Sequence, residues 1–248
     1  MNQAVTYKTK CHACPLRNKA IFRPFKEEEL NFVMKFKAGE LTVEEGATIV
    51  LEDNNSPHLY TLLEGWAFRH KALQDGRRQV LNFALPGELI GLQLALLDEM
   101  QHTVTALTDT TLCVFHKEKI WSIFQDYPAL AYSITWMAAR EEQLIDSHLL
   151  SLGQRTAKER LANLILHLYD RAETVGYAGN MTLDAPFSQG HLSEALGITT
   201  VHTSRTIRKL HDLELISWTR DRIRILNRQA LEKVACYEPV EATQRPMI

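Results

Sequence analysis

The residues with the clearest potential for chemistry are Cys11 and Cys14, in the sequence Cys-His-Ala-Cys. Two thiolates at this spacing can hold one metal ion or one edge of an iron–sulfur cluster. Cys113 and Cys236 stand alone, and four cysteines in 248 residues are too few for a disulfide scaffold. The residues by themselves leave three interpretations open: a metal or cluster site, a thiol or disulfide role, and a purely structural role in which Cys113 is a buried apolar residue.

A second group of residues is suited to binding an anionic polymer. Between positions 199 and 228 the chain carries seven Lys or Arg residues and three acidic ones, whereas the whole chain has a formal net charge of −2. Clustered positive charge neutralises phosphates, so this segment predicts a confined nucleic-acid footprint on a mildly acidic protein. A solvated charged surface is the alternative. The seven residues are Arg205, Arg208, Lys209, Arg220, Arg222, Arg224 and Arg228.

The basic segment begins in a sequence typical of a helix-turn-helix. In residues 187–210, Ser188 can cap a short helix that Gly197 ends, and a second helix starts a few residues later. The second helix would enter the major groove of DNA. In residues 215–218 and 222–225, apolar and polar residues alternate on either side of a turn. This pattern predicts a two-stranded wing with Arg at its tip. The predicted DNA-contacting residues are Ser188, Thr199, Thr200, Val201, His202, Ser204, Arg205, Arg208, Lys209 and Arg222.

These basic elements follow a region that reads as an all-β domain. Turn signals such as Glu45-Gly46, Asp75-Gly76 and Pro86-Gly87 recur about every ten residues between positions 36 and 115. Apolar and polar residues alternate in 66–71 and 81–85, on either side of the second of these turns. We therefore expect a β-barrel or β-sandwich that includes a hairpin with one buried face.

A long helix is predicted for residues 128–152, which lack Pro after the first position and lack Gly. Apolar residues recur along it at the spacing of a coiled-coil seam. Packing on the β domain would explain this seam. We favour a coiled coil between two protomers, because apolar residues on both sides of the helix would leave one seam exposed in a monomer. The residues predicted to form the dimer seam are Leu130, Ile134, Met137 and Leu144.

The helical domain is expected to begin near Gly153, because Thr156 and Glu159 have the spacing of a capping box at a new helix. The fold class is α+β, and residues after Tyr237 are expected to be frayed. The predicted division is a Cys-containing segment (1–20), a β-roll sensor domain (21–127), a dimerisation helix (128–152), a winged helix-turn-helix (153–228) and a carboxy-terminal helix or tail (229–248).

Several function classes are disfavoured by missing patterns. The chain has no phosphate-binding loop, nucleophile elbow or His-Glu-x-x-His motif, so we do not expect an enzyme or any catalytic residue. It also lacks an apolar run long enough for a membrane span or a signal core, and we expect a soluble cytoplasmic protein with no membrane partner. A regulatory or interaction module whose β domain docks another protein is the alternative to a DNA-binding regulator.

The order of these parts resembles the superfamily of the cyclic-AMP receptor protein and the fumarate-nitrate reduction regulator (Crp/Fnr). The resemblance covers about residues 20–228, and the pair Ser204-Arg205 is similar to the Fnr-like branch. It implies a jelly-roll β domain and a homodimeric transcription factor that binds two-fold symmetric sites in double-stranded DNA, with RNA polymerase as an expected partner. It also implies that Arg205 contacts a guanine. Val201 stands where the best-known members carry a Glu, so we expect a different half-site.

The same resemblance bears on the ligand of the β-roll. It places an effector pocket at Gly87, Glu88, Leu89, Gln101 and His102. Nucleotide-binding relatives carry an Arg-Ser or Arg-Thr pair after the Gly-Glu-Leu motif, whereas this chain has residues 100–103 there and no Arg between Arg78 and Arg140. A buried phosphate without a cation is costly, so we do not expect cyclic-nucleotide binding.

An iron–sulfur cluster is the other ligand that the resemblance suggests. Cys11 and Cys14 resemble the amino-terminal cysteines of the Fnr-like branch, and Cys113 lies where that branch has a cluster ligand. The third amino-terminal cysteine is missing, because Ala20 stands in its place. An oxygen- or redox-sensing cluster is thus one interpretation of the β-roll signal, and a β-roll without cysteine chemistry is the interpretation that we favour. Histidines such as His58 and His116 also leave haem open.

Overall fold

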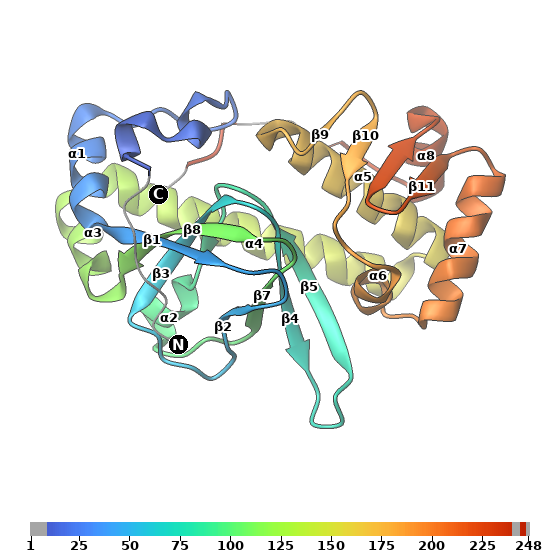
Figure 1. Ribbon diagram of the computed structural model, residues 1–248, viewed down its shortest axis with the longest axis horizontal. Helices are drawn as coiled ribbons and strands as arrows, with labels where there is room; N and C mark the ends of the chain where they lie inside the picture. The colour runs from blue at the N-terminus through green and yellow to red at the C-terminus, as the bar shows by residue number, and fades with distance from the viewer. Residues whose placement is uncertain (1–8, 240–243, 247–248) are drawn as a thin grey trace. The chain divides into compact units, whose positions relative to one another are not determined.

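The computed structural model describes residues 9–239 and 244–246, and the chain divides into two compact units (Figure 1). The first comprises residues 1–71, 84–142 and 243–248, and the second comprises residues 72–83 and 143–242. The division falls within one long helix, α4 (Pro128–Gln154), and not near Gly153 as expected. Residues of α4 beyond position 143 line a cleft with the helix that follows, which explains why they belong to the second unit.

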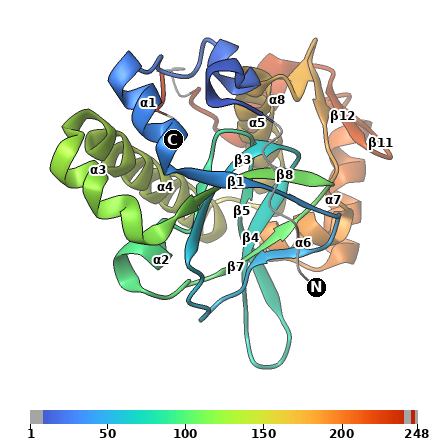
Figure 2. The same cartoon turned by 60° about the vertical axis from the view of Figure 1, so that its left-hand side comes forward.

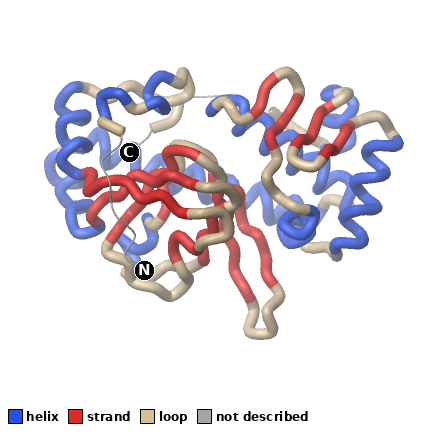
Figure 3. The backbone as a smooth tube through the Cα atoms, in the orientation of Figure 1, coloured by secondary structure: helices blue, strands red, loops and turns tan. Residues whose placement is uncertain are grey.

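The first unit is the predicted β-roll. One sheet has the strand order β1-β8-β3-β6, and β7 lies between β2 and β4 in another. Leu41 of β1 and Leu62 of β3 are both paired with Leu112 of β8, which lies between them. Figure 3 shows the strands of this unit in red, close to one another. Their bounds are β1 Lys37–Val43, β2 Thr48–Val50, β3 His58–Glu64, β4 Ala67–Ala72, β6 Leu89–Ile90, β7 Thr103–Ala106 and β8 Thr110–His116.

Short helices surround this roll and share its apolar core. The α1 residues Val33 and Phe36 and the α3 residues Ile120 and Ile123 are buried with the inward-facing residues of the strands. Figure 2 shows α3 beside the first part of α4. The bounds are η1 Cys11–Ala13, η2 Pro15–Asn18, α1 Glu27–Phe36, α2 Leu92–Leu97, η3 Lys117–Lys119 and α3 Ile120–Asp126.

The predicted single buried face of the hairpin strands is wrong. In β4, Ala67, Phe68 and Arg69 are buried in succession, and in β5 (Arg78–Ala84) Phe83 and Ala84 are adjacent and both buried. Alternation marks a strand with one wet face, whereas a strand covered on both sides buries neighbouring residues. The predicted Asp75-Gly76 turn is present, and Gly76 has the positive φ of 86° that favours glycine.

Two of the four residues predicted for the dimer seam on α4 are covered by their own unit. Leu130 and Ile134 are buried in the core of their own β-roll, and Met137 packs against that core. Leu144, farther along the same side, lines the cleft beside α5. The prediction is thus wrong for Leu130 and Ile134, because the coiled-coil spacing identifies one side of a helix without saying what covers it, and it stays a prediction for Met137 and Leu144. The exposed apolar residues of α4 lie elsewhere on the helix and are Tyr132, Ile145, Leu149 and Leu150.

The second unit contains β5 and the predicted helical domain. The capping box of Thr156 and Glu159 opens α5 as expected. The wing strands β11 and β12 lie in a four-stranded sheet of order β11-β12-β10-β9, whereas we expected two strands. The short strands after Gly176 were missed because they have only two and three residues. The bounds are α5 Ala157–Val175, β9 Ala178–Gly179, β10 Thr182–Asp184, α6 Gln189–Leu196, α7 Thr200–Asp212, β11 Ile216–Thr219, β12 Arg222–Ile225 and α8 Arg228–Ala235.

The carboxy-terminal residues differ from the expected frayed tail where the structure describes them. The α8 helix packs on α5 within the second unit. Arg245 belongs to the first unit, where its amide donates to the Ile21 carbonyl at 2.7 Å and its guanidinium lies over the Phe22 ring. The α8 helix ends at Ala235, before Pro239, and the residues around Pro246 still pack on the first unit. No helix among the described residues is long and apolar enough to cross a membrane.

Candidate nucleic-acid interface

The helix-turn-helix is fixed by its caps. The Ser188 hydroxyl accepts from the His191 amide at the start of α6, and Gly197 ends this helix with a φ of 63°. The Thr199 hydroxyl accepts from the His202 amide and starts α7. These contacts satisfy helix-end amides that would otherwise have no partner. Ser188 and Thr199 are therefore capping residues, a role predicted from the sequence for Ser188 only.

The outer side of α7 presents the polar residues that were predicted to contact DNA. Thr203, Thr206 and Leu210 are buried toward the domain, with the hydroxyls of both threonines donating to carbonyls one turn earlier. A capped, amphipathic helix with a basic exposed side is suited to the major groove. The exposed residues of this side are Thr200, Val201, His202, Ser204, Arg205, Arg208 and Lys209.

Some predicted contact residues also bind within the domain. The Ser204 hydroxyl donates to the Gln189 amide oxygen, which ties α7 to α6. Arg222 is exposed in β12, where its guanidinium lies 3.3 Å from the Asp184 carboxylate of β10. Arg208 lies 4.0 Å from Asp212 at the surface, a pair too exposed to hold its side chain. We therefore expect DNA contact most strongly for Arg205 and Lys209, the other exposed cations of α7.

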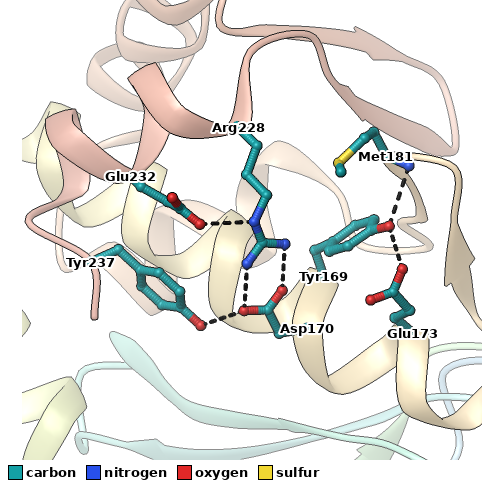
Figure 4. Close-up of polar contacts among 7 residues, drawn as sticks. All are labelled: Tyr169, Asp170, Glu173, Met181, Arg228, Glu232 and Tyr237. Atoms are coloured by element: carbon teal, nitrogen blue, oxygen red, sulfur yellow. Dashed lines mark hydrogen bonds and ion pairs between the residues drawn. The ribbon is translucent and has the colours of Figure 1, made fainter. Parts of the chain in front are cut away.

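Arg228 does not belong to the basic surface, although it counts toward the basic segment. Its Nη1 and Nη2 donate to both oxygens of Asp170 at 2.7 and 3.0 Å, and its Nε donates to Glu232 (Figure 4). The Tyr237 hydroxyl donates to the same Asp170 carboxylate at 2.8 Å. This two-pronged pairing joins α8 to α5 behind the wing. A sequence count of charge cannot separate such internal cations from those that face solvent.

The interior of the β-roll contains a cation that sequence reasoning missed. Arg69 of β4 is only 4% exposed, donates to the Leu89 carbonyl at 2.9 Å, and lies 3.8 Å from Glu88 and 2.8 Å from Glu141 of α4. The inference that the roll lacks a buried cation is therefore wrong. The expected cation position follows the Gly-Glu-Leu motif, whereas Arg69 comes from β4, which precedes this motif.

The predicted effector residues are only partly brought together. Leu89 and Glu88 contact Arg69, and burial with the nearby Arg69 and Lys71 charges lowers the pKa of His102 to about 4. Gly87 instead packs under the Phe22 ring, and Gln101 is exposed. The polar cluster in the roll is thus centred on an arginine that already lies between two carboxylates.

The cysteines Cys11, Cys14 and Cys113 line one small cleft together with Lys37. The Lys37 ammonium donates to Glu40 at 2.7 Å, and burial raises the pKa of Cys113 to about 12. Within residues 9–239 and 244–246, no three His, Cys, Asp or Glu side chains are placed to hold a metal ion. The three cysteines therefore line one cleft, as the resemblance implied, but their surroundings in the described part of the chain include a buried ammonium and no fourth ligand, which does not fit a cluster.

Comparison with known proteins identifies a domain family in each part of the chain. Residues 40–127 match the cyclic nucleotide-binding domain, and residues 159–234 match the Crp-like helix-turn-helix domain. The chain is 28% identical to the nitrogen fixation regulation protein FixK of Bradyrhizobium diazoefficiens, over 91% of this chain and 93% of that protein. It is 30% identical to the transcriptional activatory protein AadR of Rhodopseudomonas palustris, over 74% and 76%. The solved structure of FixK2 from Bradyrhizobium japonicum superposes with a TM-score of 0.73 and 26% identity, over 81% of this chain and 98% of that one.

Proposed function

Because the chain belongs to the Crp/Fnr family of transcription regulators, we propose that it acts as a homodimer that reads a two-fold symmetric DNA site with one α7 helix in each half-site. The relatives are regulators of transcription and not enzymes. The observation that carries the proposal is the capped α7 helix, whose exposed side is basic while its inner side is buried. A symmetric dimer doubles the contact surface and fixes the half-site spacing at about one helical turn of DNA.

A gel-shift titration of the full chain against fragments of its own genome tests this function. We expect a subset of fragments to be retarded at concentrations far below those that retard random DNA of equal length, because base contacts add to the phosphate term. Equal affinity for all fragments, or no binding, would contradict the proposal. Arg77→Gln, in an exposed turn, is a charge control that should leave the pattern unchanged.

We assign the dimer interface to the exposed side of α4. Tyr132 is 71% exposed and Leu149 is 67% exposed, a large apolar area for one helix of a monomer. A Leu149→Asp variant should sediment as a monomer and lose affinity for symmetric sites, whereas Leu73→Asp, at another exposed apolar residue outside α4, should remain dimeric. A Leu149→Asp protein that stays dimeric would place the interface elsewhere.

The signal received by the β-roll is, in this proposal, not a cyclic nucleotide. Arg69 is the buried cation that could meet a cyclic phosphate, and it already lies beside Glu88 and Glu141. An incoming phosphate would have to displace or approach two carboxylates, which is electrostatically unfavourable. Isothermal titration with cyclic AMP should give no heat of binding, and saturable binding that Arg69→Gln abolishes would overturn this part.

The cysteine cleft enters the proposed function as a structural site. Protein purified without oxygen should contain no stoichiometric iron and show no visible absorption band, before or after exposure to air. An air-sensitive band with bound iron, lost in Cys113→Ser, would make the protein a cluster-based oxygen sensor instead. RNA polymerase is the proposed partner at promoters, in keeping with relatives whose names describe transcriptional activation.

A further inference from the structure

A cleft in the second unit has the character of an anion-binding site. It lies between β5, the end of α4, α5 and the last residues of α6, and every residue that lines it belongs to this one unit. Its lining includes Arg160, Arg171, His148 and His167 and, among the described residues, no Asp or Glu. The predicted function uses none of these residues. A cleft with two guanidinium groups and no acidic lining has a positive potential.

Both arginines donate to neighbouring oxygen atoms, and other side chains that line the cleft have buried polar atoms without a hydrogen-bond partner. Arg171 donates to the Asn82 side-chain oxygen at 3.0 Å and to the Phe83 carbonyl at 2.8 Å. Asn82 thereby has its oxygen satisfied, but its buried Nδ2 has no hydrogen-bond partner in the structure. An amide nitrogen can only donate, so the missing partner is an acceptor.

Arg160 and His148 repeat this arrangement on the other side of the cleft. Arg160 donates through Nε to the Arg155 carbonyl at 2.8 Å and through Nη1 to the Leu196 carbonyl at 2.9 Å, and its Nη2 makes no hydrogen bond to a described residue. The buried Nε2 of His148 is also without a partner. Burial and the charge of Arg160 lower the pKa of His148.

From these groups we infer that the cleft binds a small organic anion, with a carboxylate or phosphate group on a short apolar body. The Nη2 of Arg160 would meet the anionic group together with the Nδ2 of Asn82 and the Nε2 of His148, since buried polar atoms without a partner, such as the latter two, are rare in native proteins. The apolar body would lie against leucines of α4 and α5, such as Leu144 and Leu164. A bound anion would connect β5 and α5 to the carboxyl end of α6, one residue before Gly197 of the helix-turn-helix.

Anion binding goes beyond the proposed function. It is tested without DNA, so a failure to bind anions leaves the DNA-binding proposal standing, and a failure to bind DNA leaves the anion site standing. The probes are phenyl phosphate and benzoate, with inorganic phosphate as the bare anionic group and benzyl alcohol as the neutral counterpart. Binding to the full chain is followed by the ring signals of His148 in NMR spectra and by isothermal titration. At least one aryl anion should shift the His148 signals saturably, and benzyl alcohol should not.

Two variants establish the location. Arg160→Gln and His148→Phe should each weaken binding of the aryl anion by about tenfold or more, because each removes a hydrogen bond to a charged group. Arg77→Gln removes one positive charge from the exposed turn before β5 and should leave the affinity unchanged. His148→Phe keeps an aromatic ring at this position and serves as a second, independent variant in case Arg160→Gln does not fold. The inference is overturned if neither anion shifts His148, if benzyl alcohol binds as well as benzoate, or if folded variants bind like the wild type.

Discussion

We propose that single residues of α7 divide into those that read bases and those that neutralise phosphates. Arg205 and Lys209 are both exposed, one turn apart on the same helix. An arginine can form a two-pronged contact with guanine, whereas a lysine near the end of the helix is suited to a phosphate. We therefore expect substitutions of the two residues to affect DNA binding differently, even though each residue contributes one positive charge.

Arg205→Ala should cost about 1–3 kcal/mol of binding free energy at the preferred site and relax the preference at one base pair of each half-site. Lys209→Ala should weaken binding to all sequences alike and lower the salt dependence by about one counterion. Fluorescence anisotropy with a preferred site and its single-base variants, at two salt concentrations, separates these effects. If both variants lose affinity uniformly, Arg205 is not the base-reading residue.

His102 makes the stability of the β-roll depend on pH. Burial, assisted by the charges of Arg69 and Lys71, lowers its pKa from 6.5 to about 4. The unfolded chain thus binds a proton between these values that the folded chain does not, so stability falls as the pH is lowered from 6.5 to 4. Between pH 7 and pH 5 this residue should cost about 2 kcal/mol of unfolding free energy.

Urea unfolding of the wild type and of His102→Gln at both pH values measures this contribution. The variant should lose less stability than the wild type on acidification, by the amount that His102 contributes. Parallel losses in the two proteins would show that His102 is solvated or already paired with an acid in the folded state.

At the scale of elements, helix ends were predictable because their chemistry is local. Ser188, Gly197 and the pair Thr156–Glu159 set the ends of α5 and α6 through contacts within four residues. The surroundings of α4 were not predictable in this way. Its repeat of Leu130, Ile134 and Met137 is the same whether the β-roll or a second protomer covers it, and only the tertiary structure decides. Arg69 and Asp170 were missed for the same reason, since their partners are distant in sequence.

The pairing of α8 with α5 should stabilise the DNA-binding unit. Asp170→Asn removes the negative charge that accepts two hydrogen bonds from Arg228 and one from Tyr237. We expect the free energy of unfolding to fall by about 1–3 kcal/mol, since hydrogen bonds to a partly buried charge are lost. Asp126→Asn, at an exposed position on α3, is the matched control. Thermal unfolding that is unchanged in Asp170→Asn would mean that packing alone holds α8.

At the scale of the whole molecule, one helix passes from the β-roll unit into the helix-turn-helix unit. The α4 helix runs from Pro128 to Gln154, contacts the roll core through Ile134, pairs with Arg69 through Glu141, and lines the anion cleft through His148. Its exposed apolar side is assigned to the partner protomer. A change in the packing of this helix would therefore bear on the roll and on the dimer, which is how a signal could alter DNA binding.

The central claim is that the chain reads a two-fold symmetric DNA sequence through α7. Selection of binding sites from a random DNA library by the full chain, with the protein-to-DNA stoichiometry measured on the enriched sequence, tests it most directly. We predict enrichment of an inverted repeat whose half-sites are about one helical turn apart, bound by two chains, with the preference at one base pair lost in Arg205→Ala. Enrichment of no sequence, or of a single asymmetric site bound by one chain, would contradict the account.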